Sequence, residues 1–196
     1  MELVYSSSLN GASFLLFELK QVVKLKQLGI SNQEIRKKVQ IENVFQFENE
    51  GRINRVLPSV MKRLEVIDEI LATIMLENSV VDQKVLNLYA IMKTDILFFE
   101  FMNEVIREKF RVNDYTLEKK ELNLFFTEKA EQSESVASWS EINIEKLKRA
   151  YMQVLIESGV VQDRKSGELN RLFINEQVKE HLRHSGDSSY IEAMGG

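Results

Sequence analysis

The sequence has no cysteine, one proline and eight glycines in 196 residues. The absence of cysteine excludes a disulfide framework and a thiol nucleophile, and it suits a protein of the reducing cytoplasm. The scarcity of proline and glycine removes the strongest breakers of regular structure, so long helices can form with few interruptions. A chain of this length can bury one sizeable core or build a few small units.

Long hydrophobic runs are also missing. The longest, "ILFFEFM", is interrupted by Glu100 and is far shorter than the roughly 20 residues that cross a membrane. The first residues, "MELVYSSSLNG", lack the basic region and apolar stretch of a signal peptide. We therefore expect a cytoplasmic protein that does not enter a membrane.

Sequence motifs of enzymes are absent as well. There is no P-loop, no dinucleotide-binding glycine pattern and no Gly-x-Ser-x-Gly arrangement. His181 and His184 lack an obvious third metal ligand, which favours surface histidines over a metal site. Glu100, Glu104 and Glu108 repeat at helical spacing without the Glu-x-x-His motif of a di-iron bundle, which favours a solvated or cation-binding helix face. The sequence predicts no catalytic activity, metal, cofactor or small-molecule substrate.

The net charge of −4 is weakly unfavourable for nucleic-acid binding, but it is unevenly distributed. The head, residues 1–66, holds ten Lys/Arg and seven Asp/Glu. The middle, residues 67–135, holds eight Lys/Arg and fourteen Asp/Glu. The tail, residues 136–196, holds eight Lys/Arg and nine Asp/Glu. A mildly basic head, an acidic middle and a near-neutral tail indicate different roles for the three segments.

Helical periodicity dominates the head. Apolar residues from Leu15 to Val23 repeat at helix spacing, and this helix is predicted to end near Gly29. In the stretch "QLGISNQEIRKKV", Ser31 and Glu34 match the S-x-x-E capping box, which predicts the start of a second helix.

A third helix is predicted from the apolar face between Ile53 and Ile67. Pro58 lies inside this pattern, where it lacks an amide donor and crowds the preceding turn. The helix therefore either starts late, near Asn54, or kinks at the proline, and we favour the late start. Two helices that meet at a short glycine-containing turn, with a third behind them, predict a helix-turn-helix-like three-helix unit over the head.

The middle is predicted to form a central helical bundle, and the tail a winged-helix-like unit. In the tail, a helix stopped by Gly159 precedes the β-prone stretch "VVQDRKSGELNRLFI", which we interpret as a short β-hairpin around Gly167. Asn175 is the predicted cap of a last short helix. The expected fold class is therefore mainly α, with three units.

Cations near both ends of the chain are the candidate DNA contacts, because lysine and arginine neutralise phosphates and arginine also reads guanine. The candidates are Arg36, Lys37, Lys38, Arg52, Arg55, Lys62 and Arg63 in the head, and Lys146, Lys148, Arg149, Arg164 and Lys165 in the tail. Two interpretations of these residues remain open: a DNA-binding surface, or a solvated charged face on a unit that docks other proteins.

Four stretches carry a resemblance to a known family: "YSSSLNGASFLLFELKQVVKLK", "LYAIMKTDILFFEFMNEVIREKF", "EKAEQSESVASWS" and "EKLKRAYMQVLIESGVV". They resemble the BrxA family of BREX bacteriophage-exclusion systems, and the likeness runs from about Tyr5 to Met194. The resemblance implies a small, helical, cytoplasmic accessory protein that binds DNA and has no enzymatic activity. It also implies action beside a DNA methyltransferase, a large ATPase and other proteins of the same defence island.

With this resemblance, the favoured function is that of a non-enzymatic DNA-binding component of a phage-defence system. It is expected to contact double-stranded DNA mainly through phosphates. The alternative is a protein-interaction scaffold that docks larger BREX proteins without touching DNA.

Overall fold

All regular elements are helices in the part of the chain that the computed structural model describes, residues 5–196, and this part contains no β-strand. A 3-10 turn η1 (Ser8–Asn10) precedes the first helix, and a π-helical segment η2 (Met102–Ile106) joins α6 to α7. The helices are α1 (Leu16–Gln27), α2 (Asn32–Glu42), α3 (Glu50–Glu65), α4 (Glu69–Glu77), α5 (Val80–Thr94), α6 (Ile96–Phe101), α7 (Arg107–Arg111), α8 (Lys119–Gln132), α9 (Glu134–Ala137), α10 (Glu141–Ser158), α11 (Glu176–His184) and α12 (Ser188–Ala193).

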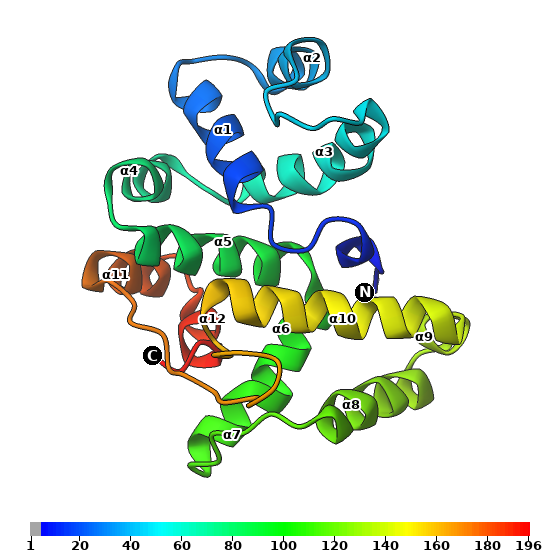
Figure 1. The fold of residues 1–196 in the computed structure, drawn as a ribbon. Coiled ribbons are helices and arrows are strands. Elements are labelled where there is room, and N and C mark those ends of the chain that lie inside the picture. Colours follow the sequence, from blue (N-terminus) through cyan, green and yellow to red (C-terminus); the bar gives the residue numbers. More distant parts are fainter. Residues whose placement is uncertain (1–4) are drawn as a thin grey trace.

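One hydrophobic core extends from Leu9 to Met194 and includes residues of head, middle and tail. The long helix α5 lies near its centre, and every residue from Val85 to Met92 is buried. Figure 1 shows α1, α2 and α3 together at one end of the molecule, with α5 and α10 crossing beneath them. No helix within residues 5–196 combines the length and the apolar character that crossing a membrane requires.

The predicted capping box at the start of α2 is confirmed. Ser31 accepts a hydrogen bond from the Glu34 amide at 3.3 Å, and the Glu34 carboxylate accepts one from the Ser31 amide at 3.1 Å. These two bonds satisfy amide donors that the first helical turn leaves free. The Ser31 hydroxyl also donates to the Glu34 carboxylate at 2.6 Å, and this bond, followed by the one from the Ser31 amide, lowers the pKa of Glu34. Ile35 and Val39 are the buried residues of α2, as its periodicity predicts.

The prediction that the third helix starts near Asn54 is wrong, because α3 begins at Glu50. The side chain of Asn49 accepts a hydrogen bond from the Gly51 amide at 2.7 Å and caps the helix ahead of the proline. Pro58 is exposed inside α3, so the hydrogen bond that its missing amide removes lies on the solvent side. The helix therefore continues through Pro58.

The β-hairpin predicted in the tail is not present as a pair of strands in residues 5–196. The stretch turns at Gly167, which has a φ of 63°, but only Val161 and Leu169 form a bridge within it. The two arms bond to each other through the Gln162 amide to the Glu168 carbonyl and the Asn170 amide to the Val160 carbonyl, both at 2.8 Å. The second arm also bonds to the segment before α8: the Leu169 amide donates to the Tyr115 carbonyl at 2.9 Å, and Thr116 forms a bridge with Glu168. Each pairing amounts to a single bridge, which is too short to count as a strand.

Other predicted signals in the tail are confirmed. The helix α10 ends where Gly159 adopts a left-handed φ of 92°, a conformation in which glycine carries no β-carbon penalty. Asn175 caps α11 by accepting a hydrogen bond from the Gln177 amide at 2.9 Å. These signals act within a few residues, so sequence alone locates them.

The aromatic part of the core provides the first testable prediction. The Tyr151 ring packs against Phe98, Phe101 and Phe126 with centroid distances of 4.9, 5.5 and 5.3 Å. Its buried hydroxyl has no hydrogen-bond partner among residues 5–196. Because a buried unsatisfied hydroxyl is destabilising, Tyr151→Phe is expected to raise the free energy of unfolding by about 1 kcal/mol, measured by urea denaturation.

Tyr89 offers the matched control for this substitution. It is also buried, but its hydroxyl donates to Asp187 at 2.7 Å. Tyr89→Phe removes a hydrogen bond to a charged acceptor and is expected to lower the free energy of unfolding by about 2 kcal/mol. Equal losses for the two variants would show that the Tyr151 hydroxyl does find a partner.

Candidate nucleic-acid interface

The helix α3 carries a row of cations on the face opposite its apolar residues. Arg52, Arg55 and Lys62 are exposed and follow one another at spacings of three and seven, which places them on one side of a helix. The Arg52 guanidinium lies 4.2 Å from the centroid of the Phe47 ring, a cation–π contact that holds it at the surface. The Arg55 side chain packs against Gly11. A β-carbon added to Gly11 would lie only 2.8 Å from the Arg55 Cδ atom.

The helix α2 stands at the outer end of the molecule in Figure 1 and buries only two side chains. Arg36 and Lys37 are exposed, whereas Lys38 forms an ion pair with Glu42 at 2.7 Å. Gln33 and Gln40 lie on the same face as Arg36 and Lys37, and the sequence analysis did not identify them. Glutamine amides read adenine in the major groove, and the i, i+3, i+4, i+7 spacing of these four residues is the signal that locates them.

We use the name head surface for the exposed cations of α2 and α3 that form no ion pair with a described carboxylate: Arg36, Lys37, Arg52, Arg55 and Lys62. The middle of the chain differs, because all its cations except Lys84 and Lys119 form ion pairs. Carboxyl groups also lie near these cations. The pKa of Glu34 is lowered mainly by the hydrogen bond from the Ser31 hydroxyl, and the charge of Lys37 adds to this shift. Burial raises the pKa of Glu18, and the charges of Arg52 and Arg63 oppose this shift. The cations of the head surface thus have carboxyl groups nearby but form no ion pair with a carboxylate of residues 5–196.

The prediction that Arg63 is an exposed DNA contact is wrong. Its side chain is 2% exposed, and its guanidinium donates hydrogen bonds to the carbonyls of Ala12, Ser13 and Phe14 at 2.5, 2.8 and 2.7 Å. Burial lowers its pKa to about 10, against the opposing charges of Asp95 and Glu18, so it remains charged at neutral pH. Arg63 holds the segment before α1 in place and has no access to a phosphate.

The tail cations are less available than those of the head. Lys148 forms an ion pair with Glu145 at 2.8 Å, and this hydrogen bond lowers the pKa of Glu145. Lys146 and Arg149 are exposed on α10, but they line a depression of about 310 Å³ together with Glu141 and Glu145. Two carboxylates therefore lie among these cations and weaken their attraction for phosphate.

The structure brings only part of the tail near the head surface. The Asn10 side chain donates to the Asn143 carbonyl of α10 at 3.4 Å, and the next residue, Gly11, supports Arg55. Arg164 and Lys165 are exposed in the turn after α10, which Figure 1 places far from α2, with α5 and α10 between them. These two residues and α2 therefore do not share one contact surface.

Comparison with known proteins identifies relatives over nearly the whole chain. A sequence model of the BrxA family matches residues 4–186. The chain is 38% identical to a protein of Bacillus cereus (strain H3081.97) named BREX protein BrxA, with all of this chain and 98% of that protein aligned. It is 23% identical to a protein of the same name from Paramagnetospirillum magneticum (strain ATCC 700264 / AMB-1), with 97% of this chain and 96% of that protein aligned.

A solved structure shares the fold. The crystal structure of an uncharacterized protein from Magnetospirillum magneticum superposes with a TM-score of 0.83, covers 97% of both chains and is 21% identical in sequence. At this level of identity the likeness shows that the two proteins share the arrangement of their helices. The chemistry of the surface has to be inferred from the residues of this chain.

Proposed function

The chain belongs to the BrxA family, and we propose on this basis that it is a DNA-binding component of a BREX phage-defence system, with the head surface as its main DNA contact. The observation that carries the proposal is the contrast in ion pairing. The cations of the head surface are exposed and have no carboxylate partner among the described residues, whereas most cations of the middle are neutralised internally. Exposed cations without a carboxylate partner are what phosphate neutralisation requires.

The chemistry of the head surface suits contact with the backbone of a duplex. Lysine and arginine bind phosphate oxygens through charge-assisted hydrogen bonds, which position a protein on DNA without reading its sequence. α2 projects from the molecule with both cations and glutamine amides, so it is the element proposed to approach a groove. No reaction step is assigned to these residues, and the proposed role is binding.

The test of this proposal is charge reversal on α2. Arg36→Glu combined with Lys37→Glu removes two phosphate contacts, each worth about 1.5–3 kcal/mol, and adds repulsion. Affinity for a duplex is expected to fall about 100-fold or more in a fluorescence-anisotropy titration at constant salt. Both side chains are exposed, so the fold is expected to stay intact by circular dichroism.

Lys84→Glu combined with Lys119→Glu is the matched control, because it makes the same change in net charge at the two cations of the middle that form no ion pair within residues 5–196. It is expected to weaken DNA binding less than about threefold, since only long-range charge changes. Equal weakening of both variants would mean that net charge, and not the head surface, governs binding. Unchanged DNA affinity of the α2 variant, with loss of co-purification with another BREX protein, would favour the scaffold function instead.

A further inference from the structure

A groove of about 330 Å³ lies between α7 and α8, at the end of the molecule opposite the head. One wall comes from η2, α7 and the residue after it, where Glu104, Glu108 and Val112 recur at intervals of four. The other wall comes from α8, where Leu124 and Glu128 face the groove. Each wall therefore combines apolar and acidic side chains at helical spacing.

The apolar part of this groove is exposed to solvent. Val112 is 71% exposed and Leu124 is 57% exposed, while Phe125 is buried beneath them. A single exposed valine or leucine is ordinary on a protein surface, but these two line the same groove from opposite walls. The groove thus offers a small apolar strip to a partner.

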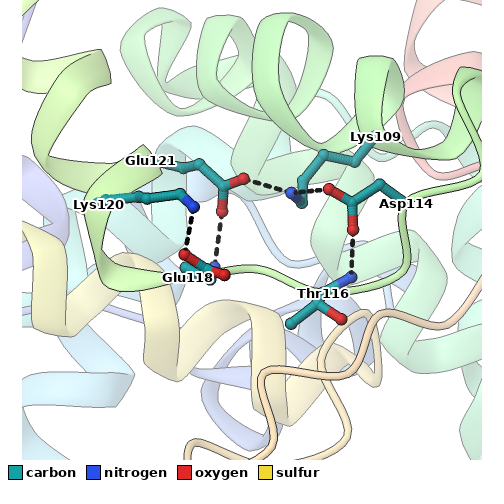
Figure 2. Close-up of polar contacts among 6 residues, drawn as sticks. All are labelled: Lys109, Asp114, Thr116, Glu118, Lys120 and Glu121. Atoms are coloured by element: carbon teal, nitrogen blue, oxygen red, sulfur yellow. Dashed lines mark hydrogen bonds and ion pairs between the residues drawn. The ribbon is translucent and has the colours of Figure 1, made fainter.

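The groove is lined by more carboxylates than cations. Figure 2 shows Lys109 between Asp114 and Glu121, and the Lys109–Asp114 distance is 2.7 Å. Burial lowers the pKa of Lys109, but the hydrogen bonds that Lys109 donates to these two carboxylates outweigh the effect of burial and raise the pKa overall, so the lysine stays charged. On the other side, Lys129 of α8 forms ion pairs with Glu100 and Glu104 at 2.7 and 2.8 Å.

These two buried lysines have a structural task. One comes from α7 and the other from α8, and each is held by carboxylates of the neighbouring elements, so together they attach α8 to the rest of the middle. Glu108 pairs only with the exposed Arg111, and Glu128 has no ion pair with any described residue. The lysines at the groove are therefore fully engaged. An external cation meets Glu128, which has no ion pair among residues 5–196, on one wall, and on the other wall Glu108, whose carboxylate is exposed but paired with Arg111.

We propose that the α7–α8 groove binds a helical segment of a partner protein that has apolar residues on one face and lysine or arginine beside them. Two neighbouring helices leave a groove that a third amphipathic helix fills, with its apolar face inward. Here the strip of Val112 and Leu124 takes that face, and Glu108 and Glu128 lie on opposite walls to meet flanking cations. The charge complementarity selects this occupant, because the same carboxylates repel DNA phosphates.

The binding test uses the full-length protein and a fluorescent synthetic peptide of leucine and lysine, arranged as an amphipathic helix of about four turns. Saturable binding is expected in an anisotropy titration. A peptide of the same composition in scrambled order is expected to bind at least about tenfold more weakly, because its apolar residues no longer form one face. Absence of binding, or equal binding of both peptides, would overturn the proposal.

Variants locate the binding site. Glu108→Lys combined with Glu128→Lys is expected to weaken peptide binding at least about tenfold, since it replaces attraction with repulsion on both walls. Leu124→Ser is expected to weaken it about fivefold through loss of the apolar contact. Both changes affect exposed side chains, so the fold is expected to be retained, which circular dichroism checks.

The matched control is Glu65→Lys combined with Glu77→Lys. These carboxylates are exposed on α3 and α4, outside the groove, and the net charge changes by the same amount. Binding is expected to stay within about twofold of the unchanged protein at physiological salt, where distant charges are screened. If this control loses as much affinity as the groove variant, the peptide binds by overall charge and the groove is not its site. Neither outcome depends on whether the head surface binds DNA.

Discussion

Replacing Arg63 with methionine is expected to lower the free energy of unfolding by about 3–5 kcal/mol, measured by urea denaturation followed by circular dichroism. The guanidinium is the donor for three consecutive backbone carbonyls, those of Ala12, Ser13 and Phe14. Methionine fills much of the space but donates nothing, so buried carbonyls lose partners at about 1–3 kcal/mol each. Relief of the desolvation cost of the buried charge offsets part of this loss.

The backbone beside this contact increases the expected effect. Leu15, which precedes α1, has a φ of 52°, a left-handed conformation that is unfavourable for a residue with a β-carbon. Arg63 holds the segment that leads into this residue, and Asn87 of α5 also donates to the Phe14 carbonyl, at 2.7 Å. Loss of Arg63 therefore loosens the start of α1 and its attachment to α3 and α5.

The neighbouring cation is the control for this prediction. Lys62→Met makes the same kind of change one residue earlier, at an exposed position, and is expected to alter the free energy of unfolding by less than about 0.5 kcal/mol. If Arg63→Met also costs less than about 1 kcal/mol, the three carbonyls are not held as the structure indicates.

DNA affinity is expected to fall about 500-fold when monovalent salt rises from 50 to 200 mM. The head surface supplies five cations, and each neutralised phosphate contributes about −0.9 to the slope of log affinity against log salt. The expected slope is therefore about −4.5, and with this slope a fourfold rise in salt reduces affinity about 500-fold. Anisotropy titrations of one duplex at several salt concentrations measure the slope directly.

The α2 variant tests whether the slope comes from the head surface. Removing Arg36 and Lys37 from the set leaves three contacts, so the slope is expected to become about −2.7. Duplexes of unrelated sequence are expected to give the same slope, because phosphate contacts carry no sequence information. Salt-insensitive binding, or a slope that the α2 variant does not change, would count against the head surface as the DNA contact.

Sequence reasoning located the candidate site only in part. It identified the basic head and the cations of α2 and α3, because an exposed helix face is visible from spacing and charge. It also included Arg63, since a lysine–arginine pair at Lys62 and Arg63 looks equally exposed in a list of charges. Helix geometry separates them: Lys62 lies on the cationic side of α3, while Arg63 turns toward the segment before α1. The division into three units stays a prediction, since one core spans them all.

By itself the sequence determined the helical class, the caps at Ser31 and Asn175, the stop at Gly159 and the basic character of the head, because each depends on residues a few positions apart. Only the tertiary structure decided which charges are available. Arg63 meets carbonyls about 50 residues away, and Lys129 meets Glu100 and Glu104 across a helix–helix contact. The predicted hairpin is reduced to a single bridge between Val161 and Leu169, and its second arm also bonds to Tyr115, about 50 residues away. Charges and strands find distant partners only after the chain has folded, and local patterns do not encode that choice.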